Sequence, residues 1–233
     1  MDPTSGHAYF NNNGRVTDLA AATPRQLKPL RQELQMIFQD PFASLNPRMT
    51  VGDIVAEPLV IHGIGKRNDR RDKVVQILER CGLKSEHLSR YPHAFSGGQR
   101  QRIGIARALV LRPAFVVADE AVSALDVCVR ARVLQLLSEL KAEFGLTMMF
   151  VSHDLSVIRH VCDRVLVMYR GRIMEQGPVE AVFNHPRHAY TKVLLSAIPL
   201  PDPDRKMVPL TVESLTPEQL QPLPDETLMP AAV

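Results

Sequence analysis

Two adjacent carboxylates follow directly on an apolar segment of the chain. Asp119 and Glu120 come after Phe115-Val116-Val117-Ala118, a continuous apolar run that predicts a strand buried on both faces of a parallel sheet. Ligands of such sheets sit beyond the carboxyl ends of the strands. Two acids at that place are able to hold magnesium and to orient an attacking water molecule. A helix cap or a solvated pair of loop acids is the plainer alternative.

A second candidate site is the tetrapeptide Ser96-Gly97-Gly98-Gln99. Its Ser-x-x-Gln spacing is a capping box, in which the hydroxyl and the amide satisfy free backbone donors at the start of a helix. The two glycines have no Cβ atoms, so the backbone can come close to a ligand. Unpaired amides and the helix dipole favour a phosphate group there. A helix cap without any ligand is the plainer interpretation.

These residues need a frame of strands and helices to hold them. Short apolar runs at residues 35–38, 115–118 and 147–151 predict strands, and the last is also predicted to be buried. Periodic apolar residues predict helices that begin at Ser96 and Asp126. Strands that alternate with helices indicate an α/β fold with a parallel sheet.

The other segments have weaker patterns. Residues 51–111 are helical in pattern and are predicted to form an inserted subdomain, with one helix over residues 69–81. Residues 1–30 are polar, with a possible strand over residues 8–10, and residues 164–175 predict a hairpin.

The C-terminal part is expected to be simpler. Two short helices are predicted after Pro178, the second over about residues 188–198. The last 35 residues contain eight of the 18 prolines and have little periodicity, which predicts an irregular or disordered tail.

Composition narrows the class of protein. A hydrophobic fraction of 45% is ordinary for a folded domain, and a net charge of +3 is too small to indicate nucleic acid without a basic stripe. No apolar run approaches the roughly 18 residues that cross a bilayer, so a membrane role depends on a partner. Cys81, Cys128 and Cys162 are too far apart for a paired metal motif. They are interpreted as reduced, partly buried thiols of a cytoplasmic protein.

Residues 95–102 resemble the signature motif of ABC ATPases, and neighbouring segments agree with it in order and spacing. Gln39 resembles the Q-loop glutamine, and Asp119-Glu120 resembles the end of the Walker B strand. Residues 123–126 resemble the D-loop, and His153 resembles the switch histidine. A lone histidine after a strand is usually structural, but this order of motifs favours the functional interpretation.

The resemblance implies a P-loop NTPase (RecA-like) fold with an inserted helical subdomain, and ATP and magnesium as cofactors. Glu120 would polarise the attacking water, His153 would sense the γ-phosphate, and Gln39 would complete the catalytic set. Asp119 and Gln39 would hold magnesium. Nucleotide binding is expected from Ser96, Gly97, Gly98, Gln99 and Asp126.

Two further segments resemble the oligopeptide and dipeptide importer ATPases, a group that also covers glutathione and nickel importers. They are residues 39–49 in the Q-loop region and residues 185–191, which continue to Pro199. This resemblance implies an ABC ATPase domain over residues 1–184 and a C-terminal extension with its tail over residues 185–233. The histidines of the extension are interpreted as structural.

The implied function is that of an ATP-hydrolysing subunit, peripheral at the cytoplasmic face of a membrane, which energises import of peptides or similar solutes. The expected partners are a second ABC ATPase subunit, two permease subunits and, indirectly, a solute-binding protein, with no nucleic acid.

Three positions depart from the motifs that are usual in this family. Phe95, Ala121 and Cys128 stand where leucine, proline and serine are more common, and none of these departures removes a catalytic group.

No Gly-x-x-x-x-Gly-Lys-Ser/Thr pattern, the P-loop, occurs in the 233 residues. In the family it lies before the position that residues 2–6 resemble. The chain is therefore expected to begin inside the domain, without the N-terminal strands and the P-loop helix. Alone it should bind ATP very weakly and hydrolyse none. The P-loop strand is expected beside the Walker B strand, so that a buried edge would be left open.

Three explanations of the absence of the P-loop pattern are open. The sequence is an incomplete record of an active ATPase, or a short non-catalytic partner that offers only its signature motif to a full-length ATPase, or the product of a degraded gene copy. Soluble ABC ATPases of translation or DNA repair share the signature. They are not expected to have this Q-loop segment together with residues 185–199.

Overall fold

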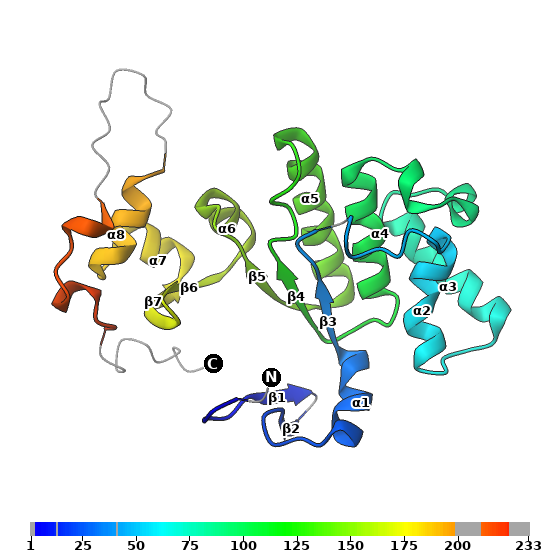
Figure 1. Cartoon of the computed structure of the whole chain (residues 1–233), viewed down its shortest axis with the longest axis horizontal. Helices are drawn as coiled ribbons and strands as arrows, with labels where there is room; N and C mark the ends of the chain where they lie inside the picture. The colour runs from blue at the N-terminus through cyan, green and yellow to red at the C-terminus, as the bar shows by residue number, and fades with distance from the viewer. Residues whose placement is uncertain (1–2, 13, 41, 199–210, 224–233) are drawn as a thin grey trace. The chain divides into compact units, whose positions relative to one another are not determined.

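The computed structural model describes residues 3–12, 14–40, 42–198 and 211–223, which belong to two compact units, Met1–Val151 and Ser152–Val233 (Figure 1). Most of the predicted C-terminal tail lies outside these described residues. The division of the chain at residues 184 and 185 stays a prediction.

The first unit contains five strands and five α-helices among the described residues. The strands are β1 (Tyr9–Asn12), β2 (Arg15–Asp18), β3 (Leu34–Ile37), β4 (Phe115–Asp119) and β5 (Thr147–Val151). The helices are α1 (Pro24–Glu33), α2 (Val51–Ile61), α3 (Arg67–Arg80), α4 (Gly97–Leu109) and α5 (Val127–Phe144). Two 3₁₀ turns, Ser85–Ser89 and Pro92–Ala94, lie between α3 and α4.

A three-stranded parallel sheet lies at the centre of this unit, in the order β3-β4-β5. This confirms the predicted α/β fold. Val116 and Ala118 of β4 are fully buried, whereas Val117 is half-buried, so only one face of β4 is closed completely. The prediction that β5 is buried was wrong. Met149 is 51% exposed because its face of the sheet is incompletely covered: its register partner Val117 on β4 is half-buried, and Met36 on β3 is 37% exposed.

The expectation that an edge beside the Walker B strand, here β4, would be left open was also wrong. The strand β4 has a hydrogen-bonded neighbour on each side, with Ile37 of β3 and Phe150 of β5 both opposite Ala118. Among the described strands of this sheet, the edges without a partner belong to β3 and β5. Asp119 at the end of β4 and Glu120 just after it therefore belong to the middle strand of the sheet and the turn that follows it.

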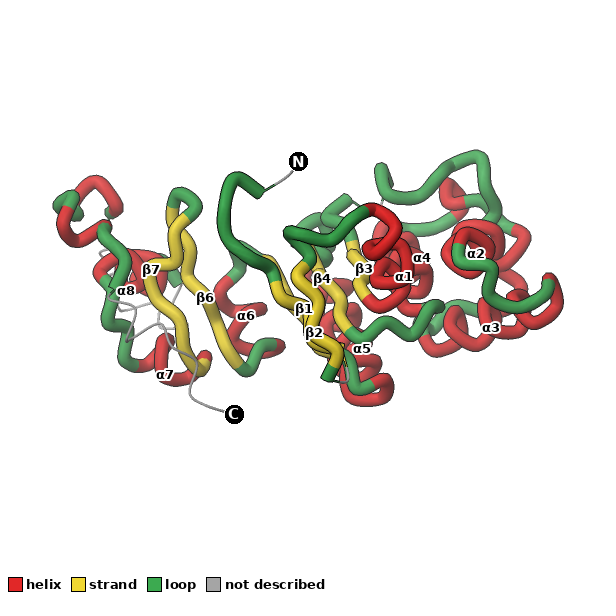
Figure 2. Tube along the Cα trace, turned by 90° about the horizontal axis from the view of Figure 1, so that it is seen from below, coloured by secondary structure: helices red, strands yellow, loops and turns green. Residues whose placement is uncertain are grey.

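The helix α1 was not predicted. Thr23 and Gln26 form a capping box at its start, and Pro24 occupies the first helical position. None of its residues is buried, and Pro29 lies inside it, a residue that normally disfavours the interior of a helix. The possible strand near residues 8–10 is confirmed as β1, which pairs antiparallel with β2 (Figure 2).

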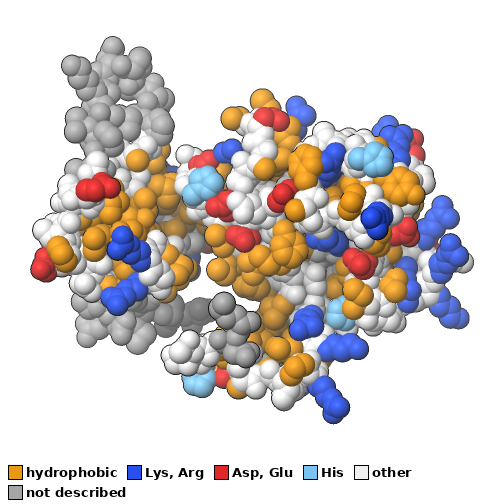
Figure 3. Space-filling model, viewed as in Figure 1, with side chains coloured by type: hydrophobic (Ala, Val, Ile, Leu, Met, Phe, Trp, Pro, Cys, Tyr) orange, Lys and Arg blue, Asp and Glu red, His pale blue; other side chains and the backbone are white. Residues whose placement is uncertain are grey.

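The helical pattern predicted over residues 51–111 is confirmed, whereas the limits of a subdomain there stay a prediction. The helices α2, α3 and α4 pack against one another, and α4 also contacts β3 and α5. Gly82 follows α3 with φ of 72°, a left-handed conformation that favours glycine at the end of a helix. The shared core of the three helices consists chiefly of Val51, Ile54, Val55, Leu59, Val74, Ile77, Leu78, Ile103 and Leu109. Basic side chains lie on the surface around α2 and α3 (Figure 3).

The second unit is built on an antiparallel hairpin of β6 (Arg164–Tyr169) and β7 (Arg172–Pro178), as predicted. Its helices are α6 (Leu155–Val161), α7 (Val179–Asn184) and α8 (Ala189–Ser196). The carboxylate of Glu175, which is 3% exposed, accepts the backbone N–H groups of Arg187 and His188 at 2.8 and 3.1 Å. This buried acid ties the segment before α8 to β7.

Part of the predicted tail is folded against this hairpin. Residues 211–223 contain two 3₁₀ turns, Val212–Ser214 and Glu218–Leu220. The Nε2 atom of His188 lies 2.8 Å from the carbonyl oxygen of Gln221, and the N–H of Leu223 donates to the carbonyl of Met174 at 3.4 Å. The prediction of a wholly irregular tail was therefore wrong for this part. Hydrogen bonds from its backbone to Met174 of β7 and to His188, just before α8, hold it, and periodicity in the sequence does not predict such bonds.

Candidate nucleotide-binding site

The structure joins two of the predicted catalytic residues. Gln39, two residues beyond the end of β3, donates a hydrogen bond from Nε2 to Oε2 of Glu120 at 2.6 Å. Since β3 and β4 are parallel neighbours, the segments that follow their carboxyl ends meet at one edge of the sheet. Residues 81 positions apart in the sequence thus become direct partners.

The backbone at Glu120 is held in an unusual conformation. Its φ is 44°, in the left-handed region that non-glycine residues rarely adopt. The turn is fixed by the N–H of Glu120, which donates to Val151 at 2.9 Å, and by Ser123. The backbone N–H and the hydroxyl of Ser123 each donate to the carbonyl of Glu120 at 3.0 Å. Strain of this kind is typical of positions where a side chain must be aimed at a ligand.

Asp119 is a better candidate than Glu120 for a ligand of magnesium. Its carboxylate is half-buried, and it makes no hydrogen bond or ion pair with any residue that the structure describes. Within the same ranges the amide oxygen of Gln39 accepts no hydrogen bond either. Oxygen ligands of this type suit magnesium, which is usually bound by one or two carboxylates together with substrate phosphates. In the described residues no group of three or more histidines, cysteines or acids forms a complete metal site. Such a magnesium ion would therefore depend on phosphate or water oxygens as well.

The predicted capping box is present at the start of α4. The N–H of Gln99 donates to the Ser96 hydroxyl at 3.4 Å, and the N–H of Ser96 donates to Oε1 of Gln99 at 3.0 Å. The N–H groups of Gly97 and Gly98 have no acceptor in the described part of the chain. Two free amides at the positive end of a helix of 13 residues are suited to an anion.

Gly98 has a second role that the sequence did not reveal. A Cβ atom at this position would lie 2.3 Å from Cγ1 of Val129, whereas one at Gly97 would lie 3.9 Å from Leu125 and Phe42. The start of α4 therefore presses on the first turn of α5. The carboxylate of Asp126 caps that turn and accepts the N–H of Val129 at 2.9 Å, which confirms the predicted cap.

Two arginines of α4 were missed as part of the site. Arg100 lies over the ring of Phe42, with Cζ 4.2 Å from the ring centroid, and Arg107 lies 5.8 Å from the centroid of Phe38. These two rings flank Gln39 in the sequence. The available signals were arginines seven residues apart on one helix and phenylalanines on both sides of a functional glutamine.

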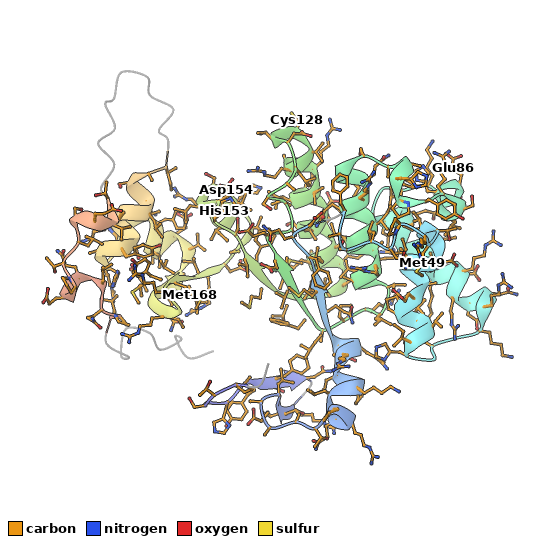
Figure 4. All side chains as sticks on the ribbon, viewed as in Figure 1. Met49, Glu86, Cys128, His153, Asp154 and Met168 are labelled. Atoms are coloured by element: carbon orange, nitrogen blue, oxygen red, sulfur yellow. The ribbon has the colours of Figure 1, made fainter. Side chains whose placement is uncertain are left out.

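His153 follows β5 and precedes α6, and it belongs to the second unit (Figure 4). Beside it, the N–H of Asp154 donates to the Ser152 hydroxyl at 3.0 Å. Its expected role as a sensor of the γ-phosphate stays a prediction.

The cysteines differ in environment. Cys81 is buried, and burial raises the pKa of its thiol to about 12. Cys162 is half-buried, whereas Cys128 is exposed near the start of α5 (Figure 4), so partial burial was wrongly predicted for Cys128.

No described helix has the length and apolar character needed to cross a membrane.

Comparison with known proteins agrees with this geometry. The ABC transporter family pattern matches residues 1–123, and that of the oligopeptide/dipeptide transporter C-terminal region matches residues 174–222. A putative peptide import ATP-binding protein of Brucella ovis is 52% identical over 206 residues, which cover 88% of this chain and 64% of the relative. The dipeptide transport ATP-binding protein of Escherichia coli is 49% identical, over 95% of this chain and 65% of its own length. The chain thus spans less than two thirds of both relatives.

Solved structures give the same fold. A dimeric ATP-binding cassette in a post-hydrolysis state, bound to ADP and Pi, matches with a TM-score of 0.66 and 28% identity, over 77% of this chain and 75% of that chain. The fold is therefore that of the P-loop NTPases. The chain belongs to the ABC transporter ATP-binding family, and its C-terminal part is of the oligopeptide/dipeptide transporter type.

Proposed function

We propose that this chain is an ATP-binding subunit that energises the import of peptides or similar small solutes. The observation that supports this most directly is the Gln39–Glu120 hydrogen bond at the carboxyl end of β4, beside the unpaired carboxylate of Asp119. Its relatives named as peptide and dipeptide import proteins support the solute class. Its partners are a second ATPase subunit and two permeases, which bring it to the membrane surface.

In the proposed reaction, water attacks the γ-phosphorus of ATP, and the bond from that phosphorus to the bridging oxygen of ADP breaks. The Glu120 carboxylate accepts the proton of the water, and Gln39 holds that carboxylate in place through Nε2. Asp119 and the amide oxygen of Gln39 would hold magnesium, and the bound ion would neutralise charge on the phosphates. His153 senses the γ-phosphate.

The signature motif acts on a different ATP molecule from the one that Glu120 faces. The free N–H groups of Gly97 and Gly98, with the Ser96 hydroxyl, bind the γ-phosphate of an ATP molecule held by the P-loop of a partner chain. Asp126 lies at the start of α5, which Gly98 contacts through Val129, and contributes to the same surface. ATP therefore binds two chains together.

The test is phosphate release by the transporter assembled from this chain, its partner ATPase and the permeases. Glu120→Gln should lower turnover at least about 100-fold, because the general base is lost. Glu79→Gln makes the same chemical change on the exposed surface of α3 and should leave turnover unchanged. Unaltered turnover in Glu120→Gln would refute the catalytic role of this residue.

The signature is tested separately by ATP-dependent association with a subunit that contains a P-loop. Ser96→Arg places a cation and a long side chain at the helix start, and should abolish the association. Association that is equally strong in this variant would refute the proposed use of the signature.

A further inference from the structure

Two arginines project from the same side of the signature helix. Arg100 and Arg107 are seven residues apart on α4, about two helical turns, so that both side chains lie on one face. Each reaches the segment that contains Gln39, here called the Gln39 segment and comprising Phe38–Asp40 and Phe42–Ser44. Arg107 lies over the ring before Gln39, and Arg100 over the ring that follows it.

Hydrogen bonds to backbone carbonyls complete these contacts. Arg107 donates from Nη1 to the carbonyl of Ser44. Arg100 donates from Nε to the carbonyl of Pro92 at 2.8 Å, and from Nη2 to that of His93 at 3.4 Å. Arg100 therefore connects the residues just before the signature motif to the Gln39 segment, while Arg107 connects the last turns of α4 to the same segment.

The environment strengthens the contacts of Arg107. Its side chain is half-buried, and this burial lowers the pKa of the guanidinium, while the charge of Glu57 on α2 raises it. An arginine stays charged throughout the ordinary pH range. A partly desolvated cation interacts more strongly with a carbonyl or an aromatic ring than a fully hydrated one does.

The Gln39 segment is short and has internal bonds. The N–H groups of Phe42 and Ala43 donate to Oδ1 of Asp40 at 2.7 and 3.2 Å, and that of Ser44 donates to the Asp40 carbonyl at 3.0 Å. These bonds join Asp40 to the residues that follow it, and the rings of Phe38 and Phe42 on either side of Gln39 both lie against arginines of α4, so these contacts restrict where Gln39 lies. The placement of Gln39 then decides whether its amide reaches Glu120.

We propose that Arg100 and Arg107 are positioning residues that fasten the Gln39 segment to the signature helix. A displacement of the start of α4 is thereby transmitted to the Gln39–Glu120 hydrogen bond. The two ends of the linkage are the phosphate-binding end of α4 and the amide that holds the catalytic carboxylate. The consequence for turnover rests on the function proposed above, whereas the fastening itself does not require nucleotide.

Hydrogen exchange of the full chain without nucleotide tests the fastening. In Arg107→Gln, exchange at the amides of Phe42, Ala43 and Ser44 should become about tenfold faster, since a charged hydrogen bond and a ring contact are lost. Arg107→Lys keeps a cation and a donor and should restore most of the protection. Arg102→Gln is the matched control, because Arg102 donates from the same helix to the carbonyl of Cys81 at 2.9 Å. It should change exchange in the Gln39 segment less than about twofold.

A second measurement, the side-chain amide resonance of Gln39, reports on the position of Gln39 itself. In protein labelled with ¹⁵N-glutamine, the side-chain amide of Gln39 is assigned with Gln39→Glu, and its dependence on the carboxylate is established with Glu120→Gln. Arg107→Gln should move this resonance toward its position in Glu120→Gln, and Arg102→Gln should not. Unchanged exchange and an unchanged resonance in Arg107→Gln would overturn the proposal, as would equal effects in Arg102→Gln. Neither measurement depends on ATP hydrolysis, so failure of the proposed function would leave the result intact.

Discussion

The two glycines of the signature motif are predicted to respond differently to the same substitution. An added Cβ at Gly98 would lie 2.3 Å from Cγ1 of Val129, far inside van der Waals contact. At Gly97 the corresponding distances, to Leu125 and Phe42, are 3.9 Å, which is ordinary contact. Gly98→Ala should therefore strain the contact between α4 and α5, and Gly97→Ala should not.

The size of the effect follows from two opposing contributions. Overpacking by one methyl group costs about 1–3 kcal/mol of the free energy of unfolding, and β-branched Val129 has few alternative rotamers in a helix. Replacement of glycine by alanine in a helix regains roughly 0.5–1 kcal/mol. We expect Gly98→Ala to be destabilising by about 1–2 kcal/mol, and Gly97→Ala to be neutral or stabilising by up to about 1 kcal/mol.

Urea denaturation followed by circular dichroism measures both variants, and Gly97→Ala serves as the matched control. The double variant Gly98→Ala/Val129→Ala removes the clashing methyl groups. It should be more stable than the sum of the single changes predicts, with a coupling free energy of at least about 1 kcal/mol. Equal stability of Gly98→Ala and the wild type, or the absence of coupling to Val129, would show that the start of α4 does not press on α5.

Three further results are expected. Cys128 should react with a thiol reagent in the native protein, whereas Cys81 should react only after unfolding, because burial raises the pKa of the Cys81 thiol to about 12. Labelling followed by mass spectrometry measures the order of reaction, and a Cys81 that reacted first would contradict this expectation. Arg159 lowers the pKa of Glu180 through a hydrogen bond of 2.8 Å, so this pair should stabilise the second unit above pH 4.5 and lose its effect as pH falls through the lowered value. A ¹³C-carboxyl titration should show the Glu180 pKa rise in Arg159→Gln, and an unchanged pKa would exclude the pairing in solution. Glu175→Ala should destabilise the protein by about 1–3 kcal/mol in thermal unfolding, because the buried N–H of His188 and the part-buried N–H of Arg187 lose their acceptor. A loss below about 0.5 kcal/mol would contradict that role.

The features that the sequence determined by itself are local ones. The capping box of Ser96 and Gln99 joins residues three apart, so its chemistry is complete within one turn of helix. The same holds for the cap of Asp126 on α5 and for the glycine that ends α3. The spacing of such local motifs along the chain was sufficient to identify the ABC ATPase family.

The tertiary structure decided which distant residues meet. The Gln39–Glu120 bond joins residues 81 positions apart and depends on β3 and β4 being parallel neighbours. The contact of Gly98 with Val129 depends on how α4 packs against other elements, and so does the hydrogen bond from Arg107 to the carbonyl of Ser44. Periodicity predicts which face of a helix is apolar, but not which residue of another element lies opposite it, because packing selects that partner in three dimensions.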